Sequence, residues 1–262
     1  MRASMKSWVR WNSATYGVTL GALLSLSLML VSCSGEQASI TQEIPASPIT
    51  QAAMPSAEEM TAGLPKLNGK ATAEIKVGSK VIKVELDGDK APVTAGNFVD
   101  LAEKGVYDGT IFHRVVRSPE PFVAQGGDPQ SVDPSVPVNQ LGSGGYKDSS
   151  GRERTIPLEI LPEGAEQPVY GQTFPEAGVM ESPALNHRRG AIAMARSGVN
   201  TASSQFYITL ADVAFLDGNY AVFGYVTEGM DSVDDIRIGD VITSVTVTSG
   251  AENLVTPEVT AE

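Results

Sequence analysis

One arginine in an apolar stretch is the first candidate for chemistry in this sequence. Residues 111–128 read IFHRVVRSPEPFVAQGGD, so Arg114 is followed by an aromatic residue, Phe122, and by an amide, Gln125, that leads into two glycines. A guanidinium is always charged and presents a rigid fork of N–H donors. No cysteine, zinc-ligand pair or activated serine accompanies it. We therefore expect a site that works without a covalent nucleophile.

The rest of the sequence does not favour metal-centred or phosphate-binding chemistry. His113 and His187 are the only histidines and lie far apart in the chain, which disfavours a metal site and a Ser-His-Asp hydrolase. The segment GSGGYK, residues 142–147, is rich in glycine but lacks the Gly-Lys-Ser/Thr ending of a phosphate-binding loop. We expect neither a metal ion nor another cofactor.

The bulk composition suits one globular domain with an acidic surface. With 262 residues, of which 42% are hydrophobic, the chain is long enough to bury a sizeable core. Its formal net charge is -12 at pH 7. Nucleic-acid binding needs clustered Lys and Arg to contact phosphates, so this charge argues against nucleic acid as a partner.

The N-terminus has the pattern of a secretory signal. Three basic residues precede the apolar segment 16–31: Arg2, Lys6 and Arg10. That segment is shorter than the roughly 20 residues that a membrane-spanning helix needs. It ends in LVSC, which resembles a bacterial lipobox, where a signal peptidase cuts before an acylated cysteine.

We therefore predict that residues 1–32 are a lipoprotein signal peptide and that Cys33 is lipidated. The protein would then be exported and held on a bacterial membrane by this anchor. The alternative is an uncleaved anchor in which Cys33 is an incidental buried residue. Because Cys33 is the only cysteine, no intramolecular disulfide can form.

Composition divides the remainder into three parts. Residues 33–68 are rich in Ser, Thr, Ala, Pro, Gln and Glu and have no sustained apolar period, which predicts a disordered tether. Residues 69–250 carry regular patterns and form the expected domain. Residues 251–262 are predicted to be a disordered C-terminal tail.

Strand and helix patterns fill the expected domain. ATAEIKV and KVIKVEL alternate apolar and polar residues around Gly78-Ser79, which predicts a β-hairpin. PVTAGNFVDLAEKG predicts a helix with Pro92 in its first turn and Gly105 at its end, and MDSVDDIRI predicts a second, short helix. Six more strands are predicted at TIFHRVV, PFVAQ, GAIAMA, SQFYITL, AVFGYV and VITSVTVT. Many short strands with two helices indicate a closed barrel.

Five segments, in this order, resemble the cyclophilin family of peptidyl-prolyl cis-trans isomerases: FHRVV, PFVAQGGD, GAIAMARSG, SSQFYITL and LDGNYAVFGYVTEGMDSVDDI. The resemblance runs from about Lys70 to Ser249. It implies a mainly β fold, a closed eight-stranded antiparallel β-barrel capped by two α-helices, with a substrate groove on its outer face. It also implies isomerase activity on proline-containing polypeptides, and we expect a monomer.

The resemblance assigns roles residue by residue. The catalytic arginine of the family falls on Arg114, and the aromatic and amide of the next block fall on Phe122 and Gln125. Val123 stands where methionine is usual. The other substrate-binding residues that the resemblance implies are Ala195, Arg196, Ser197, Gln205, Tyr207, Phe215, Leu216 and Tyr220.

Strand alternation supports part of this set independently. In SQFYI, Gln205 and Tyr207 point to one face of the strand, while Phe206 and Ile208 point to the other. We expect one face to contact substrate and the other to pack in the core. Taken alone, Arg114 would also suit a structural ion pair, and the aromatic residues would suit a barrel core.

Several positions depart from the family pattern. Arg196 stands where many members have asparagine, Phe215 where many eukaryotic members have tryptophan, and Tyr220 where histidine is frequent. The spacer VVRSPEP is longer than in compact members, and the segment 131–170 carries an acidic insertion, LEILPEGAEQP. We expect these departures to affect substrate range more than activity.

The leading functional hypothesis is a lipid-anchored peptidyl-prolyl isomerase that assists the folding of exported proteins. The first alternative is a non-catalytic module that binds proline peptides in the same groove. A solute-binding lipoprotein is the least favoured class, because the chain is short for two lobes and lacks alternating strands and helices.

Overall fold

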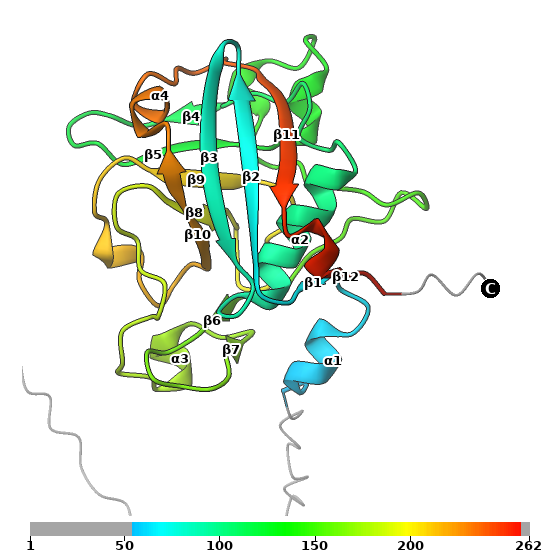
Figure 1. The fold of residues 1–262 in the computed structure, drawn as a ribbon, viewed down its shortest axis with the longest axis vertical. Helices are drawn as coiled ribbons and strands as arrows, with labels where there is room; N and C mark the ends of the chain where they lie inside the picture. Colours follow the sequence, from blue (N-terminus) through cyan, green and yellow to red (C-terminus); the bar gives the residue numbers. More distant parts are fainter. Residues whose placement is uncertain (1–53, 258–262) are drawn as a thin grey trace, which may run out of the picture. The chain divides into compact units, whose positions relative to one another are not determined.

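A computed structural model describes residues 54–257; the predicted signal peptide, Cys33 and most of the predicted tether lie outside the described residues. Eight antiparallel strands form the main sheet, in the order β11-β2-β3-β10-β8-β9-β5-β4 (Figure 1). The strands are β2 Lys70–Val77, β3 Lys80–Asp87, β4 Arg114–Val115, β5 Val123–Gly126, β8 Ala191–Met194, β9 Phe206–Thr209, β10 Val222–Glu228 and β11 Ile242–Ser249. These are the eight predicted strands.

The sheet is a curled half-barrel, so the prediction of a closed barrel is wrong. β4 and β11 stand at the two ends of the strand order and do not pair with each other. Residues 110–116 were expected to form one strand, but only Arg114 and Val115 pair with β5. An isolated bridge joins Ile111 to Val241 just before the two end strands. No strand ladder closes the sheet, because the segment that would supply it is mostly irregular.

The first hairpin confirms the expectation from alternation. β2 and β3 pair without a shift from Lys70 opposite Asp87 to Val77 opposite Lys80. Gly78, with φ of 60°, occupies the left-handed conformation that the tight turn requires. Ala73 and Ile75 are fully buried while Glu74 between them is more exposed. One face of this hairpin therefore faces the core.

Four α-helices occur among residues 54–257, where two were predicted: α1 Ala57–Thr61, α2 Pro92–Glu103, α3 Phe174–Ala177 and α4 Met230–Asp234. The two predicted helices are α2 and α4. α1 and α3 span barely one turn each, which is too short to show an apolar period in the sequence. Each begins with a capping box. No helix in this part of the chain is long and apolar enough to cross a membrane.

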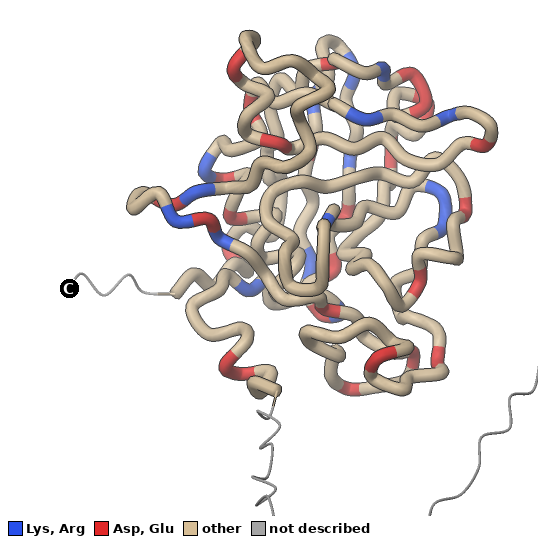
Figure 2. The backbone as a smooth tube through the Cα atoms, turned by 180° about the vertical axis from the view of Figure 1, so that it is seen from behind, with Lys and Arg blue, Asp and Glu red and all other residues tan. Residues whose placement is uncertain are grey.

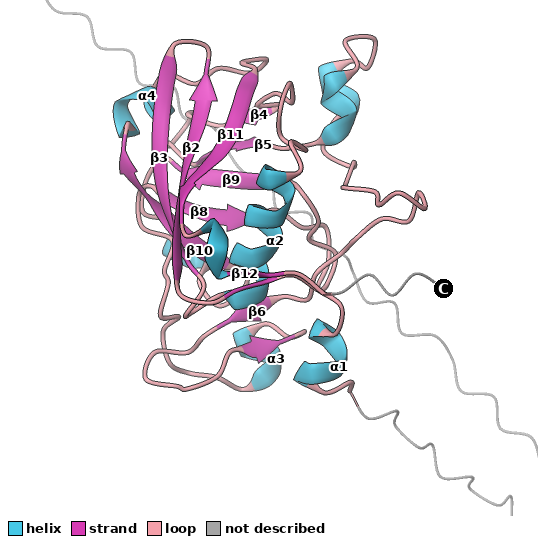
Figure 3. Ribbon diagram, turned by 45° about the vertical axis from the view of Figure 1, so that its right-hand side comes forward, coloured by secondary structure: helices cyan, strands magenta, loops and turns pink. Residues whose placement is uncertain are grey.

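Regular structure extends past both predicted limits of the domain. A disordered tether was predicted up to residue 68 and a disordered tail from residue 251, but β1 (Lys66–Leu67) pairs with β12 (Leu254–Val255). Leu67 is fully buried. α2 packs against both β1 and β12, and Figure 3 shows β12 beside α2. The prediction is therefore wrong for α1, β1 and β12.

Aromatic side chains fill the core beneath the candidate site. Phe206 on β9 packs edge-on against Phe98 of α2 and against Tyr107, at centroid distances of 5.4 Å in both cases. Phe98 also lies 5.2 Å from Phe223 of β10. Phe206 and Ile208 are fully buried, which confirms the predicted packing face of this strand.

The acidic insertion is joined to α2 through one buried carboxylate. Glu159 lies in β6 (Glu159–Ile160), which pairs with β7 (Val169–Tyr170). Its carboxylate accepts hydrogen bonds from the backbone N–H groups of Val93 and Thr94 at 3.1 and 2.7 Å. The hydroxyl groups of Thr94 and Tyr170 donate to it as well, both at 2.7 Å. Glu159 thus caps the N-terminal turn of α2 from outside the helix.

Candidate active site

A cavity of about 190 Å³ opens beside β4, β5 and β9. Nine residues line it, and all nine are among the substrate-contacting or catalytic residues predicted from the sequence: Arg114, Phe122, Val123, Gln125, Ala195, Arg196, Tyr207, Leu216 and Tyr220. They come from segments up to about a hundred residues apart in the chain. The fold therefore brings most of the predicted set to one place.

Arg114 is held in position by an amide opposite it. Arg114 and Gln125 face each other across the β4–β5 pair. Nη1 of Arg114 donates to Oε1 of Gln125 at 3.2 Å, and the guanidinium lies 5.5 Å from the centroid of the Phe122 ring. Arg114 itself is exposed, so its remaining N–H donors are available to a ligand in the cavity.

The amide of Gln125 is part of a longer chain of hydrogen bonds. Its Nε2 donates to Oε1 of Gln205 at 3.1 Å, and Nε2 of Gln205 donates to the carbonyl oxygen of Gly144 at 2.7 Å. Gln205 is buried. Every member of this chain donates in the same direction, so the orientation of each amide is determined by its neighbours and the Arg114 guanidinium is oriented in turn.

Apolar side chains form one side of the cavity. Phe122 and Leu216 line it. Phe215, in the 3-10 turn Ala214–Leu216, stacks on Phe122 at a centroid distance of 5.6 Å but is 71% exposed. The structure therefore places Phe215 at the rim, next to the cavity and not among its lining residues.

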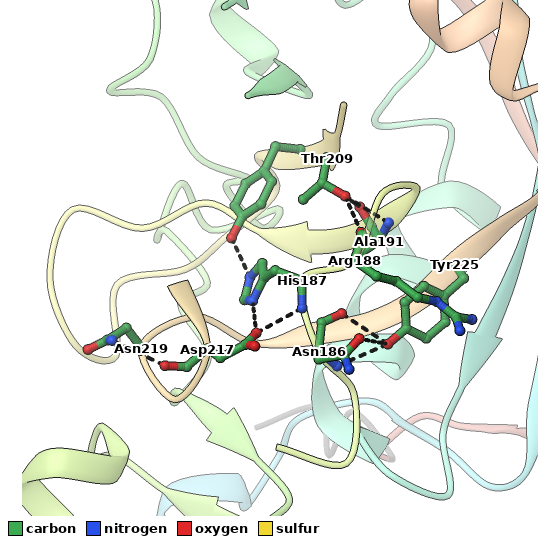
Figure 4. A network of polar contacts seen from close by, with 9 residues as sticks. Asn186, His187, Arg188, Ala191, Thr209, Asp217, Asn219 and Tyr225 are labelled. Atoms are coloured by element: carbon green, nitrogen blue, oxygen red, sulfur yellow. Dashed lines mark hydrogen bonds and ion pairs between the residues drawn. The ribbon is translucent and has the colours of Figure 1, made fainter. Parts of the chain in front are cut away.

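Tyr207 connects the cavity to a buried polar network. Its hydroxyl group lies 2.9 Å from Nε2 of His187. Nδ1 of His187 lies 2.7 Å from Oδ1 of Asp217, and Figure 4 shows these two side chains in contact. Burial lowers the pKa of His187, although Asp217 acts in the opposite direction. A neutral His187 donates a hydrogen bond from Nδ1 to Asp217 and accepts a hydrogen bond from the Tyr207 hydroxyl group at Nε2.

The sequence did not point to this network. His187 was considered only as a metal ligand or as the histidine of a hydrolase triad, and Asp217 was not singled out. His187 lies 20 positions from Tyr207 and 30 positions from Asp217 in the chain. No short motif joins the three residues. The only signal was the position of Asp217 directly after Leu216, which the resemblance had already placed in the groove.

A second cavity, of about 490 Å³, adjoins the first. Gln125, Ala195 and Arg196 line both cavities, whereas Ser197 and Gln205 line only the second. The N–H of Ala195 donates to the Gln205 carbonyl, while the N–H of Arg196 donates no hydrogen bond to another group within residues 54–257. An extended peptide that crosses from one cavity to the other could pair with this free amide.

No group of three or more His, Cys, Asp or Glu residues that could hold a metal ion occurs between residues 54 and 257. The glycine-rich segment 142–147 contributes Gly142 and Gly144 to the wall of the second cavity. Their backbone N–H groups donate to Asp128 at 2.6 and 3.2 Å. The segment is thus held as a loop by a carboxylate, which engages two of its amides.

Comparison with known proteins places the chain in a family. Residues 72–254 match the family described as cyclophilin type peptidyl-prolyl cis-trans isomerase/CLD. A putative thylakoid lumen peptidyl-prolyl cis-trans isomerase of Synechocystis is 40% identical over 210 residues, which cover 75% of this chain and 52% of that protein. A chloroplastic peptidyl-prolyl cis-trans isomerase of Arabidopsis thaliana is 38% identical over 218 residues, covering 74% and 46%.

Among solved structures, a cyclophilin type peptidyl-prolyl cis-trans isomerase of Cryptosporidium parvum is 26% identical with a TM-score of 0.48, covering 69% of this chain and 98% of that one. The chain spans about half the length of the two relatives from Synechocystis and Arabidopsis. The match to the family extends over most of the described residues and includes all of the curled sheet except the first two residues of β2. The chain belongs to the cyclophilin-type peptidyl-prolyl cis-trans isomerase family.

Proposed function

We propose that this protein catalyses cis–trans isomerisation of X-Pro bonds in exported polypeptides, with Arg114 as the principal catalytic residue. The observation that carries the proposal is the position of the Arg114 guanidinium. It is held by Gln125 at the edge of a cavity whose other walls include Phe122, Leu216 and Tyr207. A cation and an apolar pocket side by side match the two parts of an X-Pro unit, the amide and the ring.

The reaction needs electrostatic stabilisation and no covalent step. Rotation about a peptide C–N bond has a barrier of roughly 18–20 kcal/mol because amide resonance is lost on twisting. In the twisted state the proline nitrogen regains its lone pair and becomes a better hydrogen-bond acceptor. A fixed guanidinium directed at this nitrogen stabilises the twisted state more than either planar state, which lowers the barrier.

The neighbouring residues then have distinct roles. The proline ring packs against Phe122 and Leu216, which exclude water from that side. Gln125 orients Arg114 and stands near the carbonyl group of the residue that precedes proline. The main chain at Ala195 and Arg196 pairs with the peptide backbone. No proton transfer, metal ion or cofactor is required for this step.

Peptide turnover with an Arg114→Ala variant tests the proposal. We expect the parent chain to accelerate isomerisation of a proline tetrapeptide in a protease-coupled assay, and Arg114→Ala to lose on the order of 100- to 1000-fold in rate. Peptide affinity, measured by calorimetry, should change far less, because the apolar cavity remains. The matched control is Arg152→Ala, since the side chain of Arg152 is 84% exposed and lies away from the cavity.

The same experiment separates the enzyme from a binding module. A parent chain that binds proline peptides without turnover above buffer would establish the non-catalytic alternative. An Arg114→Ala variant with the full rate would contradict the assigned mechanism, even if the parent is active.

We also propose that the protein is exported and anchored to a membrane through lipidated Cys33. The support is the basic and apolar N-terminal pattern that ends in LVSC, together with the thylakoid lumen location in the name of the Synechocystis relative. Labelled palmitate should appear on the parent chain in the membrane fraction and should be absent from Cys33→Ala. A Cys33→Ala chain that remains labelled and membrane-bound would exclude this anchor.

A further inference from the structure

The smaller cavity is unusual in its charge. Two of its nine lining residues, Arg114 and Arg196, are cations, and none is acidic. Neither arginine forms an ion pair within residues 54–257. The chain as a whole has a formal charge of -12, with acidic residues spread over many loops in Figure 2. A cavity with two unpaired cations is therefore a local exception on an acidic protein.

Arg196 is held rigidly on one side and is free on the other. Its Nε and Nη2 donate to the carbonyl oxygen of Asn219 at 3.1 and 2.5 Å. Its guanidinium also lies over the Tyr220 ring, 4.6 Å from the centroid. Nη1 makes no hydrogen bond to another group in the described part of the chain. A guanidinium fixed in this way offers N–H donors to a ligand at a small cost in side-chain entropy.

The nearby carboxylates form no ion pair with Arg196 within residues 54–257, although the charge of Arg196 contributes, after hydrogen bonds from Thr173, to lowering the pKa of Glu176. Glu176 is engaged by Thr173, whose N–H and hydroxyl group both donate to it at 2.8 Å. Asp217 accepts from His187. Glu153 lines the second cavity together with Arg196 but forms no ion pair with it. The positive charge of Arg196 is therefore available to a bound peptide.

The position of Arg196 indicates which peptide residue it meets. Arg196, Ala195 and Gln125 line both cavities, so a peptide that extends from one to the other passes them. Gln125 lies on the carbonyl side of the X-Pro bond in the proposed function. With the proline ring in the smaller cavity, the residue that precedes proline then lies at this boundary, next to Arg196.

We propose that Arg196 selects substrates in which an acidic residue immediately precedes the proline. This inference rests on the proposed function, because it assigns the smaller cavity to the proline ring. A carboxylate accepts two N–H bonds from a guanidinium, and the charge-assisted pair is stronger than a pair with a neutral amide. Arg196 is thus a specificity-determining residue, and its side chain has a role distinct from that of its backbone amide.

The test compares peptides that differ in one charge. The probes are acetylated Ala-Glu-Pro-Ala and Ala-Gln-Pro-Ala amides, with turnover measured by exchange NMR. We expect the parent chain to favour the Glu-Pro peptide by about three- to tenfold in catalytic efficiency, as a partly exposed ion pair allows. With glutamate after the proline, in Ala-Ala-Pro-Glu, the preference over the peptide with glutamine at that place should be smaller. A larger preference there would overturn the assigned position.

Three variants locate the origin of the preference. In Arg196→Gln the ratio of Glu-Pro to Gln-Pro efficiency should fall to about one. Arg196→Lys keeps the charge but loses the fork to Asn219, so it should retain most of the ratio if charge is the cause. Arg152→Gln removes one exposed charge away from the cavities and should leave the ratio unchanged. An unchanged ratio in Arg196→Gln would overturn the assignment.

Failure of the proposed function can be told apart from failure of this inference. If the parent turns over neither peptide, the proposed function fails. The dissociation constants of the same two peptides then test the selectivity of Arg196, and equal values would overturn it. If Arg196→Gln does not fold, the salt dependence of the Glu-Pro preference in the parent tests the inference. The Glu-Pro preference should shrink as salt is raised from low to high concentration, because ions screen a partly exposed pair. A preference independent of salt would contradict an ion pair.

Discussion

The hydroxyl group of Tyr207 lies 2.9 Å from Nε2 of His187, and this contact joins the wall of the candidate active site to a buried imidazole ring. His187 is in turn bonded to Asp217 through its side chain and its backbone N–H, at 2.7 and 2.8 Å. Asp217 directly follows Leu216, which lines the same cavity as Tyr207. Two walls of the cavity are thus tied together through one imidazole ring.

Removal of the Tyr207 hydroxyl group should destabilise the fold. Tyr207→Phe keeps the ring but leaves Nε2 of His187 buried without a partner, which costs about 1–3 kcal/mol of unfolding free energy. Urea denaturation measures this loss. Tyr220→Phe is the matched control, because Tyr220 lines the same cavity and is partly exposed, and its loss should be close to zero. Equal losses in the two variants would show that the His187 contact does not matter.

Acidification should weaken the fold through its histidines. Burial lowers the pKa of both His113 and His187 below the usual value of 6.5. A histidine with a lowered folded-state pKa contributes stability in full above 6.5, and this stability is lost as the pH falls from 6.5 toward the folded pKa, because the unfolded chain binds more protons. The midpoint of urea unfolding should therefore decrease between pH 7 and pH 5.

A variant isolates the contribution of one ring. His187→Gln should show a shallower decrease than the parent over the same pH range. Burial raises the pKa of Glu159, which works in the opposite direction, but Glu159 is present in both chains and cancels in the comparison. Identical pH profiles for parent and variant would mean that His187 does not titrate in this window.

Gln125 and Arg114 should act as one unit in catalysis. Gln125→Ala removes the acceptor that lies 3.2 Å from Nη1 of Arg114, so the guanidinium loses its orientation but keeps its charge. We expect a smaller rate loss than for Arg114→Ala, on the order of tenfold. In the double variant the losses should not add, because the Gln125 effect acts through Arg114. Additive losses would assign Gln125 an independent role on substrate.

Glu159 should be the main anchor of the insertion. Glu159→Gln replaces one carboxylate oxygen by an NH₂ group, which then faces the N–H donor of either Val93 or Thr94, and we expect a loss of about 1–3 kcal/mol in unfolding free energy. Glu163→Ala is the control, since Glu163 is exposed in the same insertion. Hydrogen exchange at the first turn of α2 should increase in Glu159→Gln alone. Unchanged exchange there would contradict the capping role.

Local patterns predicted the strands and the site well. Alternation around Gly78-Ser79 gave the β2–β3 hairpin, and alternation in SQFYI placed Phe206 in the core and Tyr207 at the cavity. Both are properties of neighbouring residues in one strand. The site residues come from several such segments, and only the resemblance to a known family indicated that they meet.

Long-range contacts were beyond the reach of the sequence. Whether β4 pairs with β11 depends on how much of the irregular segment before β4 forms strand hydrogen bonds. β4 itself has two residues, which are too few to show an alternation of apolar and polar side chains. Leu67 and Leu254 lie in the two segments that were predicted to be a disordered tether and a disordered tail, but they pair with each other. Glu159 was predicted only as part of an acidic insertion, because nothing near it in the chain shows that its partners belong to α2.

The pairing of β1 with β12 has a consequence for the order of assembly. Leu67 pairs with Leu254, which lies far from it in the sequence, so this ladder can form only after the chain has emerged from the ribosome, or has crossed a membrane, as far as Leu254. Until then, Leu67 has no strand partner. Deleting Leu254 and Val255 would therefore leave β1 without its partner strand. Proteolytic cleavage near Leu67 would then report whether β12 is paired.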